Sequence, residues 1–272
     1  MKISAIIPAY NEAENIALVV GGLRALRNTA GAPLIHEVIV ADNGSSDDTA
    51  AIATGSGAIV IPVPERGYGS ACARACEIAS GDVLLFADGD HTADLAQTTL
   101  LIDAITEGAD LAIGVRAHAT RGSLSLPQRF GNGLACLLVR LIWAVPISDL
   151  GPFRAIRRSA YRRIGMRDRA YGWTIEMQIR AAQLHMRTTE VAVSWLPRHA
   201  GSSKVSGTVQ GVLGAAWGIL SMIARLWWME RRDQSPPRST AASIITVEGL
   251  PAGQAQRTGN TTTSRRPFFN QE

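Results

Sequence analysis

Two aspartates separated by one glycine, Asp88 and Asp90, have the spacing in this sequence that best fits metal chemistry. They follow the apolar run 82–87, which predicts a buried strand. Two carboxylates on such a turn can reach one hard cation, because Mg²⁺ and Mn²⁺ take oxygen ligands and often share them with substrate phosphates. The glycine permits a close approach or an unusual backbone angle. Asp-Gly-Asp turns also occur in ordinary loops, so the meaning of the pair depends on its surroundings.

The surrounding elements alternate between strands and helices over the first 115 residues, which predicts a parallel sheet covered by helices. Strands are expected at residues 3–8, 37–41, 58–63, 82–87 and 109–115, and helices at 13–27 and about 67–79. In open sheets of this kind, ligands bind beyond the carboxyl ends of the strands. The polar residues near these ends are Tyr10, Asn11, Glu12, Asp42, Asp88, Asp90 and Arg116. We therefore expect the site at this edge of the sheet.

Two further features at this edge suggest a nucleotide, although both have plainer interpretations. Asp42 could accept hydrogen bonds from a base or ribose, or act as a turn or N-cap aspartate. Gly67 and Gly69 precede a helix and could bring backbone N–H groups near an anion. Their spacing matches neither the dinucleotide-binding pattern nor a Walker loop, and no Gly-x-Ser-x-Gly elbow occurs. Dinucleotide oxidoreductase, P-loop and acyl-transfer functions therefore lose support.

Positive charge is available in the loops that follow the sheet. The cations in question are Arg116, Arg129, Arg154, Arg198 and Lys204. A departing nucleoside diphosphate develops negative charge, which a metal and fixed cations stabilise. An acceptor that is itself a phosphate arrives ionised and needs such cations, whereas a hydroxyl acceptor needs a general base. Asp149 and Glu176 are candidate bases for the second case, or else a turn carboxylate and an exposed helix carboxylate.

The second half of the chain departs from the strand–helix alternation. A helix is expected at 130–143, a loop entering a short strand or turn at 149–154, a helix at 174–185 and a strand at 190–196. Residues 209–228 form a strongly apolar segment that contains three tryptophans and only Arg225 as a charge. It could lie on a membrane surface, span the bilayer once or pack on the domain. Residues 233–272 are rich in Ser, Thr, Pro, Gly and Gln, and we expect a disordered tail.

Composition is that of a globular protein, with 46% hydrophobic and 18% charged residues. The net charge of +4 suits a phosphate-bearing substrate or an anionic membrane, but only weakly. Three cysteines without metal-ligand spacing argue against a disulfide framework and a zinc site. The N-terminus runs directly into an apolar strand pattern, so we expect no signal peptide and a cytoplasmic catalytic part.

Several ordered motifs resemble the glycosyltransferase family 2 domain, which has the GT-A fold. They are residues 5–12 (AIIPAYNE), 40–47 (VADNGSSD), 88–90 (DGD), 114–116 (GVR), 149–154 (DLGPFR), 172–177 (GWTIEM) and 201–208 (GSSKVSGT). Together they look like the branch of dolichol-phosphate mannose synthases and bacterial polyprenyl-phosphate sugar synthases. The resemblance covers roughly residues 2–225 and implies a Rossmann-like, mostly parallel sheet with flanking helices.

The resemblance implies roles for individual residues. Pro8, Tyr10, Glu12 and Asp42 match nucleoside-binding positions, and Asp88 and Asp90 match positions that hold the metal and diphosphate. The branch often has a glutamine two places after the second aspartate as a metal ligand, and Thr92 takes that place here. Arg116 and Arg129 match arginines that contact phosphates, and Lys204 lies in a loop that closes over them. The family inverts the anomeric centre.

We therefore expect an inverting glycosyltransferase that moves a hexose from GDP-mannose or UDP-glucose to a polyprenyl or dolichyl phosphate. It would use Mg²⁺ or Mn²⁺ and act at the inner face of the cell membrane, with no nucleic-acid partner and an undetermined oligomeric state. The alternatives are a hydroxyl acceptor on a glycan, glycolipid or small molecule, and a non-catalytic nucleotide-sugar-binding or scaffold protein. The expected parts are a GT-A domain at 1–208, an apolar membrane-associated helix at 209–232 and the tail at 233–272.

Overall fold

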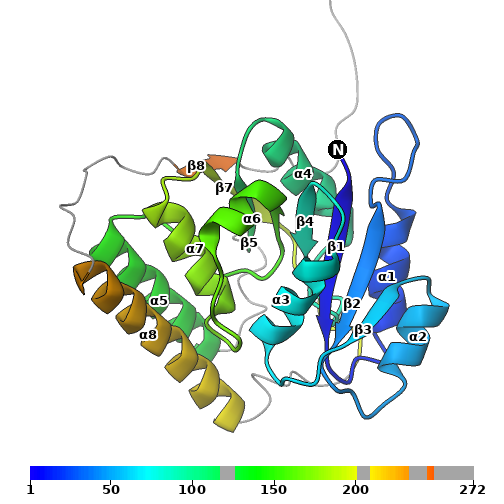
Figure 1. Ribbon diagram of the computed structural model, residues 1–272, viewed down its shortest axis with the longest axis horizontal. Helices are drawn as coiled ribbons and strands as arrows, with labels where there is room; N and C mark the ends of the chain where they lie inside the picture. Colours follow the sequence, from blue (N-terminus) through cyan, green and yellow to red (C-terminus); the bar gives the residue numbers. More distant parts are fainter. Residues whose placement is uncertain (117–125, 201–208, 233–243, 248–272) are drawn as a thin grey trace, which may run out of the picture.

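The computed structural model describes residues 1–116, 126–200, 209–232 and 244–247 (Figure 1). Its centre is a sheet in the order β3-β2-β1-β4-β6-β5-β7-β8. The strands are β1 (Ile3–Ala9), β2 (Glu37–Asp42), β3 (Ile59–Pro62), β4 (Val83–Phe86), β5 (Leu111–Arg116), β6 (Arg154–Arg157), β7 (Thr188–Val193) and β8 (Ile244–Val247). All pairs are parallel except those of β6, which runs antiparallel to both β4 and β5. The expected α/β class with a mostly parallel sheet is confirmed.

Helices cover both faces of this sheet. They are α1 (Ile16–Ala25), α2 (Thr49–Gly55), α3 (Tyr68–Ile78), α4 (Thr98–Thr106), α5 (Leu126–Trp143), α6 (Arg158–Ile164), α7 (Trp173–Gln183) and α8 (Val209–Arg232), with a short 3-10 turn at Leu95–Gln97. One apolar core lies between the sheet and α1, α2 and α4, with Ile16 and Leu101 among its members. A second lies between the sheet and α3, α6 and α7, with Cys72 and Trp173. Cys72 is a free, buried cysteine in this core, where it packs as a small apolar residue.

A third core joins α8 to the domain, because Met222, Ile223 and Leu226 of α8 pack with residues of α5 and α7. The figure shows α5 and α8 side by side at the edge of the molecule (Figure 1). Trp217 of α8 remains 75% exposed, so the helix has one packed face and one open face. In the described residues, no helix combines the length and the hydropathy that crossing a bilayer requires. The sequence left three alternatives for this segment: a membrane-surface helix, a single span or packing on the domain. The structure shows packing on the domain for the face that contains Met222, Ile223 and Leu226.

One strand lies inside the range where the tail was expected. Ile244–Val247 form β8, which pairs in parallel with β7 and extends the sheet, and the rest of 233–272 lies outside the described residues. The sequence there is Ile-Ile-Thr-Val, a run of β-branched residues that favours strand. The polar composition of the surrounding residues obscures this short run.

Gly67 and Gly69 at the start of α3 serve packing and not anion binding. The N–H of Gly69 donates to the carbonyl of Ala170 at 3.2 Å, and the N–H of Ser70 donates to the carbonyl of Arg169 at 3.0 Å. Gly67 has a φ of 142°, which favours glycine. The N–H of Gly67 donates to Oδ1 of Asn43 at 2.8 Å. The start of α3 is thereby fixed against the 169–170 segment, and the N–H groups of both glycines already have partners.

Replacing Gly69 with alanine is expected to lower the free energy of unfolding by about 1–3 kcal/mol. A methyl group there would lie 2.5 Å from the carbonyl oxygen of Asp168 and 2.9 Å from the Cα of Arg169, both backbone atoms. Gly21 in α1 is the matched control, because a methyl group there meets nothing within 4 Å. Gly21→Ala should raise stability by up to about 1 kcal/mol through helix propensity. Denaturant unfolding of both variants tests this, and equal effects at the two positions would contradict it.

Candidate active site

The Asp-Gly-Asp turn after β4 packs directly on the segment that follows β1. A methyl group at Gly89 would lie 3.5 Å from the carbonyl oxygen of Pro8 and 3.5 Å from Cγ of Glu12. Each of these two segments contains a non-glycine residue in the left-handed region, Asn11 with a φ of 53° and His91 with a φ of 56°. Such conformations are costly and tend to persist at functional turns. The structure therefore brings the first and third motifs of the sequence together.

Both aspartates of the turn are held by hydrogen bonds. The hydroxyl of Tyr68 donates to Oδ1 of Asp88 at 3.2 Å. The backbone N–H and the hydroxyl of Thr92 both donate to Oδ1 of Asp90, at 3.1 Å and 2.7 Å. Burial, and after it the charge of Asp90, raises the pKa of Asp88 to about 7, and Glu12 adds to this shift. The carboxylates repel one another, so the site favours a cation.

These residues fit a divalent metal that is shared with a substrate. In the described part of the chain, no three His, Cys, Asp or Glu side chains are grouped so that they could hold a metal alone. Mg²⁺ typically binds through one or two carboxylates and takes its other ligands from phosphates and water. Asp88 and Asp90 fit that pattern, whereas the hydroxyl of Thr92 is directed at Asp90. Thr92 thus orients a carboxylate in this structure, and its predicted role as a ligand is untested.

Mn²⁺ affinity is expected to fall as the pH is lowered through about 7. A cation needs the ionised carboxylate, and with a pKa of about 7 the Asp88 carboxyl passes from mostly ionised to mostly protonated between pH 8 and pH 6. The apparent affinity should therefore drop about tenfold over that interval. Electron paramagnetic resonance of free Mn²⁺ measures it. Asp88→Asn should bind Mn²⁺ weakly and without this pH dependence, and a constant wild-type affinity would contradict the expectation.

Arg116, at the end of β5, is held between an acid and an aromatic ring. Its Nη1 donates to Oδ1 and Oδ2 of Asp149 at 2.7 Å and 2.8 Å, and its backbone N–H donates to Oδ2 at 3.1 Å. Its guanidinium lies 4.3 Å from the centroid of the Trp195 ring. Nε of Arg116 is buried and has no hydrogen-bond partner in the structure. The guanidinium is thus fixed in place while its buried Nε–H donor is unused, as an anion-binding group would be.

The residues predicted to bind the nucleoside lie at the ends of β1 and β2. Asp42 accepts a hydrogen bond from the N–H of Ser45 at Oδ1, at 3.2 Å, as expected of a turn aspartate. Its other carboxylate oxygen can still accept a hydrogen bond from a ligand. Tyr10 is 37% exposed, and the guanidinium of Arg66 lies 4.3 Å from its ring centroid. Asn43 fixes the segment before α3 by donating to the carbonyls of Val63 and Glu65. An aromatic ring, a cation and an acid therefore line this end of the sheet.

Glu176 lies outside this arrangement. It is 1% exposed, and its carboxylate accepts hydrogen bonds from the backbone N–H groups of Arg167 and Asp168 and from Nε of Arg180. The expectation of an exposed helix carboxylate is wrong, because α7 packs this side of its first turn against the 167–168 loop. These contacts explain Glu176 as a residue that holds the loop, and we leave it out of the proposed catalytic set.

The other predicted cations differ in their burial and in their contacts. Arg154 is 1% exposed and donates to the backbone carbonyls of Gly151 and Thr174, and burial lowers its pKa to about 10. It therefore holds the 149–154 loop from inside the protein. Arg129 is exposed near the start of α5. Lys204 lies outside the described residues, so its predicted role stays a prediction.

Sequence reasoning missed several residues that contact the predicted site. Trp195 and Arg66 stack on predicted site residues, and Tyr68 donates to Asp88. Arg198 was recognised as a loop cation but not as a partner of the metal turn. Its Nη2 donates to Oδ2 of Asp90 at 2.6 Å. Position beside a motif could have drawn attention to Arg66 and Tyr68, which flank Gly67, whereas nothing in the sequence signals the contacts of Trp195.

Comparison with known proteins gives consistent matches. Residues 4–165 match the family model described as glycosyl transferase family 2. An uncharacterized glycosyltransferase of Mycobacterium tuberculosis is 32% identical over 222 residues, which are 80% of this chain and 98% of that protein. Polyprenol monophosphomannose synthase of Mycolicibacterium smegmatis is 30% identical over 81% of this chain and 88% of its own. Undecaprenyl-phosphate mannosyltransferase of Micrococcus luteus is 29% identical, with 80% and 95% covered.

Two solved structures share the fold. Mannosyl-3-phosphoglycerate synthase from Rubrobacter xylanophilus has a TM-score of 0.69 at 18% identity and covers 88% of this chain and 77% of its own. Glucosyl-3-phosphoglycerate synthase from Mycobacterium tuberculosis, in complex with Mn²⁺, UDP and glucosyl-3-phosphoglycerate, has a TM-score of 0.64 at 24% identity and covers 82% and 80%. At these identities the likeness concerns the fold alone.

Proposed function

The chain belongs to glycosyltransferase family 2 and has its GT-A fold, and we propose that it transfers a hexose from a nucleotide sugar to a polyprenyl phosphate with inversion at the anomeric carbon. The observation that carries the acceptor assignment is the pairing of Asp149 with Arg116. An alcohol acceptor must lose a proton to a base, but this carboxylate is committed to a guanidinium. A phosphate acceptor is already ionised and needs only to be positioned by cations. Two relatives named for polyprenyl-phosphate chemistry support the same choice.

The donor side of the proposal rests on the carboxylates after β1, β2 and β4. Asp88 and Asp90 would hold Mg²⁺ or Mn²⁺, which when bound neutralises the diphosphate as it leaves. Arg116 supplies a second, fixed positive charge that needs no reorganisation during the reaction. Tyr10 and Asp42 offer a ring face and an acceptor to the nucleoside. Because their contacts do not specify the base, GDP-mannose and UDP-glucose are both tested below.

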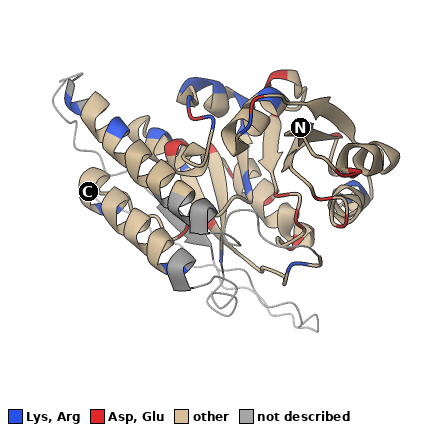
Figure 2. Cartoon of the chain, turned by 90° about the horizontal axis from the view of Figure 1, so that it is seen from below, with Lys and Arg blue, Asp and Glu red and all other residues tan. Residues whose placement is uncertain are grey.

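A membrane surface is the proposed location of the acceptor. Large apolar side chains of α5 and α8 are exposed: Leu141 at 71%, Trp217 at 75% and Trp228 at 52%. In the cartoon, α5 and α8 are mostly tan with scattered basic positions (Figure 2), and the sequence shows that these basic residues are all arginines. The guanidinium of Arg231 lies 4.1 Å from the ring centroid of Trp227, a pairing suited to the boundary between lipid and water. This distribution supports our proposal that the two helices lie parallel to a membrane surface, which we assign to the inner face of the cell membrane.

The test is a donor screen with defined acceptors. Purified protein with Mn²⁺ receives radiolabelled GDP-mannose or UDP-glucose together with polyprenyl phosphate in vesicles, and label is followed into the organic phase. We expect label in the lipid with one donor, and none when the matched polyprenol replaces the phosphate. Transfer to polyprenol, to a glycan or to phosphoglycerate instead would overturn the acceptor assignment. Absence of both transfer and donor hydrolysis would favour a non-catalytic binding protein.

A second experiment tests whether the surface of α8 binds membranes. It compares the sedimentation of wild type and of Trp217→Ser with vesicles.

A further inference from the structure

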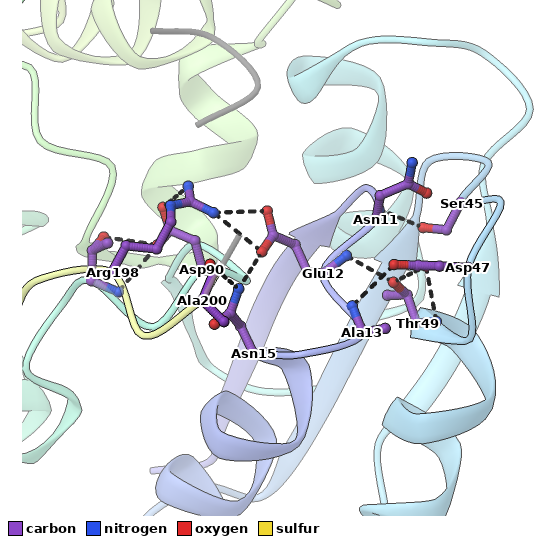
Figure 3. Close-up of polar contacts among 11 residues, drawn as sticks. Asn11, Glu12, Ala13, Asn15, Ser45, Asp47, Thr49, Asp90, Arg198 and Ala200 are labelled. Atoms are coloured by element: carbon purple, nitrogen blue, oxygen red, sulfur yellow. Dashed lines mark hydrogen bonds and ion pairs between the residues drawn. The ribbon is translucent and has the colours of Figure 1, made fainter. Parts of the chain in front are cut away.

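Arg198 bridges two of the carboxylates at the site. Its Nη2 lies 2.6 Å from Oδ2 of Asp90, and its Nη1 lies 3.3 Å from both carboxylate oxygens of Glu12 (Figure 3). Asp90 follows β4, Glu12 follows β1 and Arg198 follows β7, so the bridge joins three strand ends. The guanidinium therefore provides positive charge at a carboxylate that we assign to a divalent cation.

Both carboxylates are arranged independently of Arg198. Thr92 fixes Asp90 through Oδ1, which leaves Oδ2 to the arginine. Glu12 accepts a hydrogen bond from Nδ2 of Asn15 at 2.8 Å, and its backbone N–H donates to the hydroxyl of Thr49 at 2.8 Å. The side chains of Glu12 and Asp90 are 8% and 16% exposed, and that of Arg198 is 20% exposed. The charge of a preformed acidic site is thus partly offset by one partly accessible side chain.

The backbone that carries Arg198 is tied to the metal turn. The N–H of Leu196 donates to the carbonyl of Thr92 at 2.7 Å, and Ala93 and Trp195 form an isolated antiparallel bridge. The Cα of Arg198 therefore stays near the turn whether or not its side chain contacts Asp90. The guanidinium can leave the carboxylate by rotation of the side chain alone, without unfolding of this segment.

We propose that Arg198 is a resident counter-cation that competes with the divalent metal for Asp90 and gives up this carboxylate when metal and diphosphate enter together. This rests on the metal role of Asp90 proposed above. A guanidinium and a divalent cation that both contact Oδ2 of Asp90 repel one another and share the charge of one carboxylate, so each weakens the binding of the other. An incoming diphosphate carries negative charge that can receive the displaced guanidinium. Metal alone therefore binds weakly, and metal with nucleotide binds well.

The experiment measures Mn²⁺ binding without any transfer reaction, by the paramagnetic resonance signal of free Mn²⁺. Without nucleotide, Arg198→Gln should bind Mn²⁺ at least about fivefold more tightly than wild type, since its competitor is gone. Arg74→Gln removes the same charge from an exposed pair with Glu77 and should leave Mn²⁺ affinity unchanged. Equal or weaker binding by Arg198→Gln, or an equal gain in Arg74→Gln, would overturn the proposal.

Addition of GDP or UDP gives the second measurement. The nucleotide should raise Mn²⁺ affinity strongly in wild type and distinctly less in Arg198→Gln, because the variant has neither a competitor to displace nor a guanidinium for the diphosphate. The same rise in both proteins would contradict the exchange. Arg198→Lys keeps the charge but cannot bridge both carboxylates, so it should lie between the two, and it replaces the glutamine variant if that one unfolds. If wild type and variants all fail to bind Mn²⁺, the metal role itself fails, whereas equal binding by all sinks only the role of Arg198.

Discussion

Replacing Asp90 with asparagine should lower kcat/KM for sugar transfer by about 10³-fold while leaving the fold intact. Asparagine keeps the size of the side chain and can still accept the hydrogen bonds that Thr92 donates to Oδ1. It removes the charge that a divalent cation needs, and a single neutral oxygen is a poor replacement for a carboxylate. Turnover titrated with Mn²⁺, together with Mn²⁺ binding, measures the effect: both should be lost together.

The control separates this loss from a general effect of removing an aspartate. Asp103 lies on the exposed side of α4, and Asp103→Asn should keep wild-type turnover and Mn²⁺ dependence. Thermal unfolding of the two variants should remain close to wild type, because neither substitution removes buried apolar surface. An Asp90→Asn enzyme with unchanged turnover and Mn²⁺ dependence would end the metal assignment for this residue.

The fold could be predicted from the sequence wherever an apolar run forms a strand and polar residues follow it. The run at 82–87 predicted β4 within one residue at each end, and the polar residues after it marked the edge of the sheet where the turn lies. A short strand or turn was expected after the 149–154 loop, but its place in the sheet was not: β6, Arg154–Arg157, inserts antiparallel between β4 and β5. Four residues that begin and end with arginine show no periodicity, and only tertiary packing makes them a strand. The spacing between Asp88 and Arg116 depends on that insertion.

The candidate site was predictable in its residues more than in their pairings. Asp149 and Glu176 were both treated as carboxylates open to catalysis, yet each is buried and ionically paired, with Arg116 and Arg180 respectively. The Arg116–Asp149 pair spans 33 positions, and the Arg198–Asp90 contact spans 108. Such partners depend on which strand ends become neighbours, which local pattern does not contain. Sequence therefore names the charged groups, and the topology decides which of them remain available.

Asp149→Asn should reduce kcat by about 10²-fold without changing the shape of the pH–rate profile. Asp149 fixes the guanidinium of Arg116 on one side and Trp195 stacks on its face, so loss of the acid leaves the cation charged but misplaced. A displacement near 1 Å of a positioning group can cost about 10²-fold in rate. Asparagine still accepts the backbone N–H of Arg116, which limits the loss to the alignment of the side chain.

Variants of Trp195, which stacks on the guanidinium of Arg116, provide the comparison for Asp149→Asn. Trp195→Phe keeps a ring against the guanidinium and should retain most of kcat, whereas Trp195→Ala should fall toward the level of Asp149→Asn. If Asp149 were instead a general base, the wild-type pH–rate profile would have an acidic limb, and Asp149→Asn would remove that limb. Trp195→Ala would then keep the limb. If only Asp149→Asn loses the acidic limb, Asp149 is the base that removes the proton from a hydroxyl acceptor. The proposal of a phosphate acceptor would then be wrong.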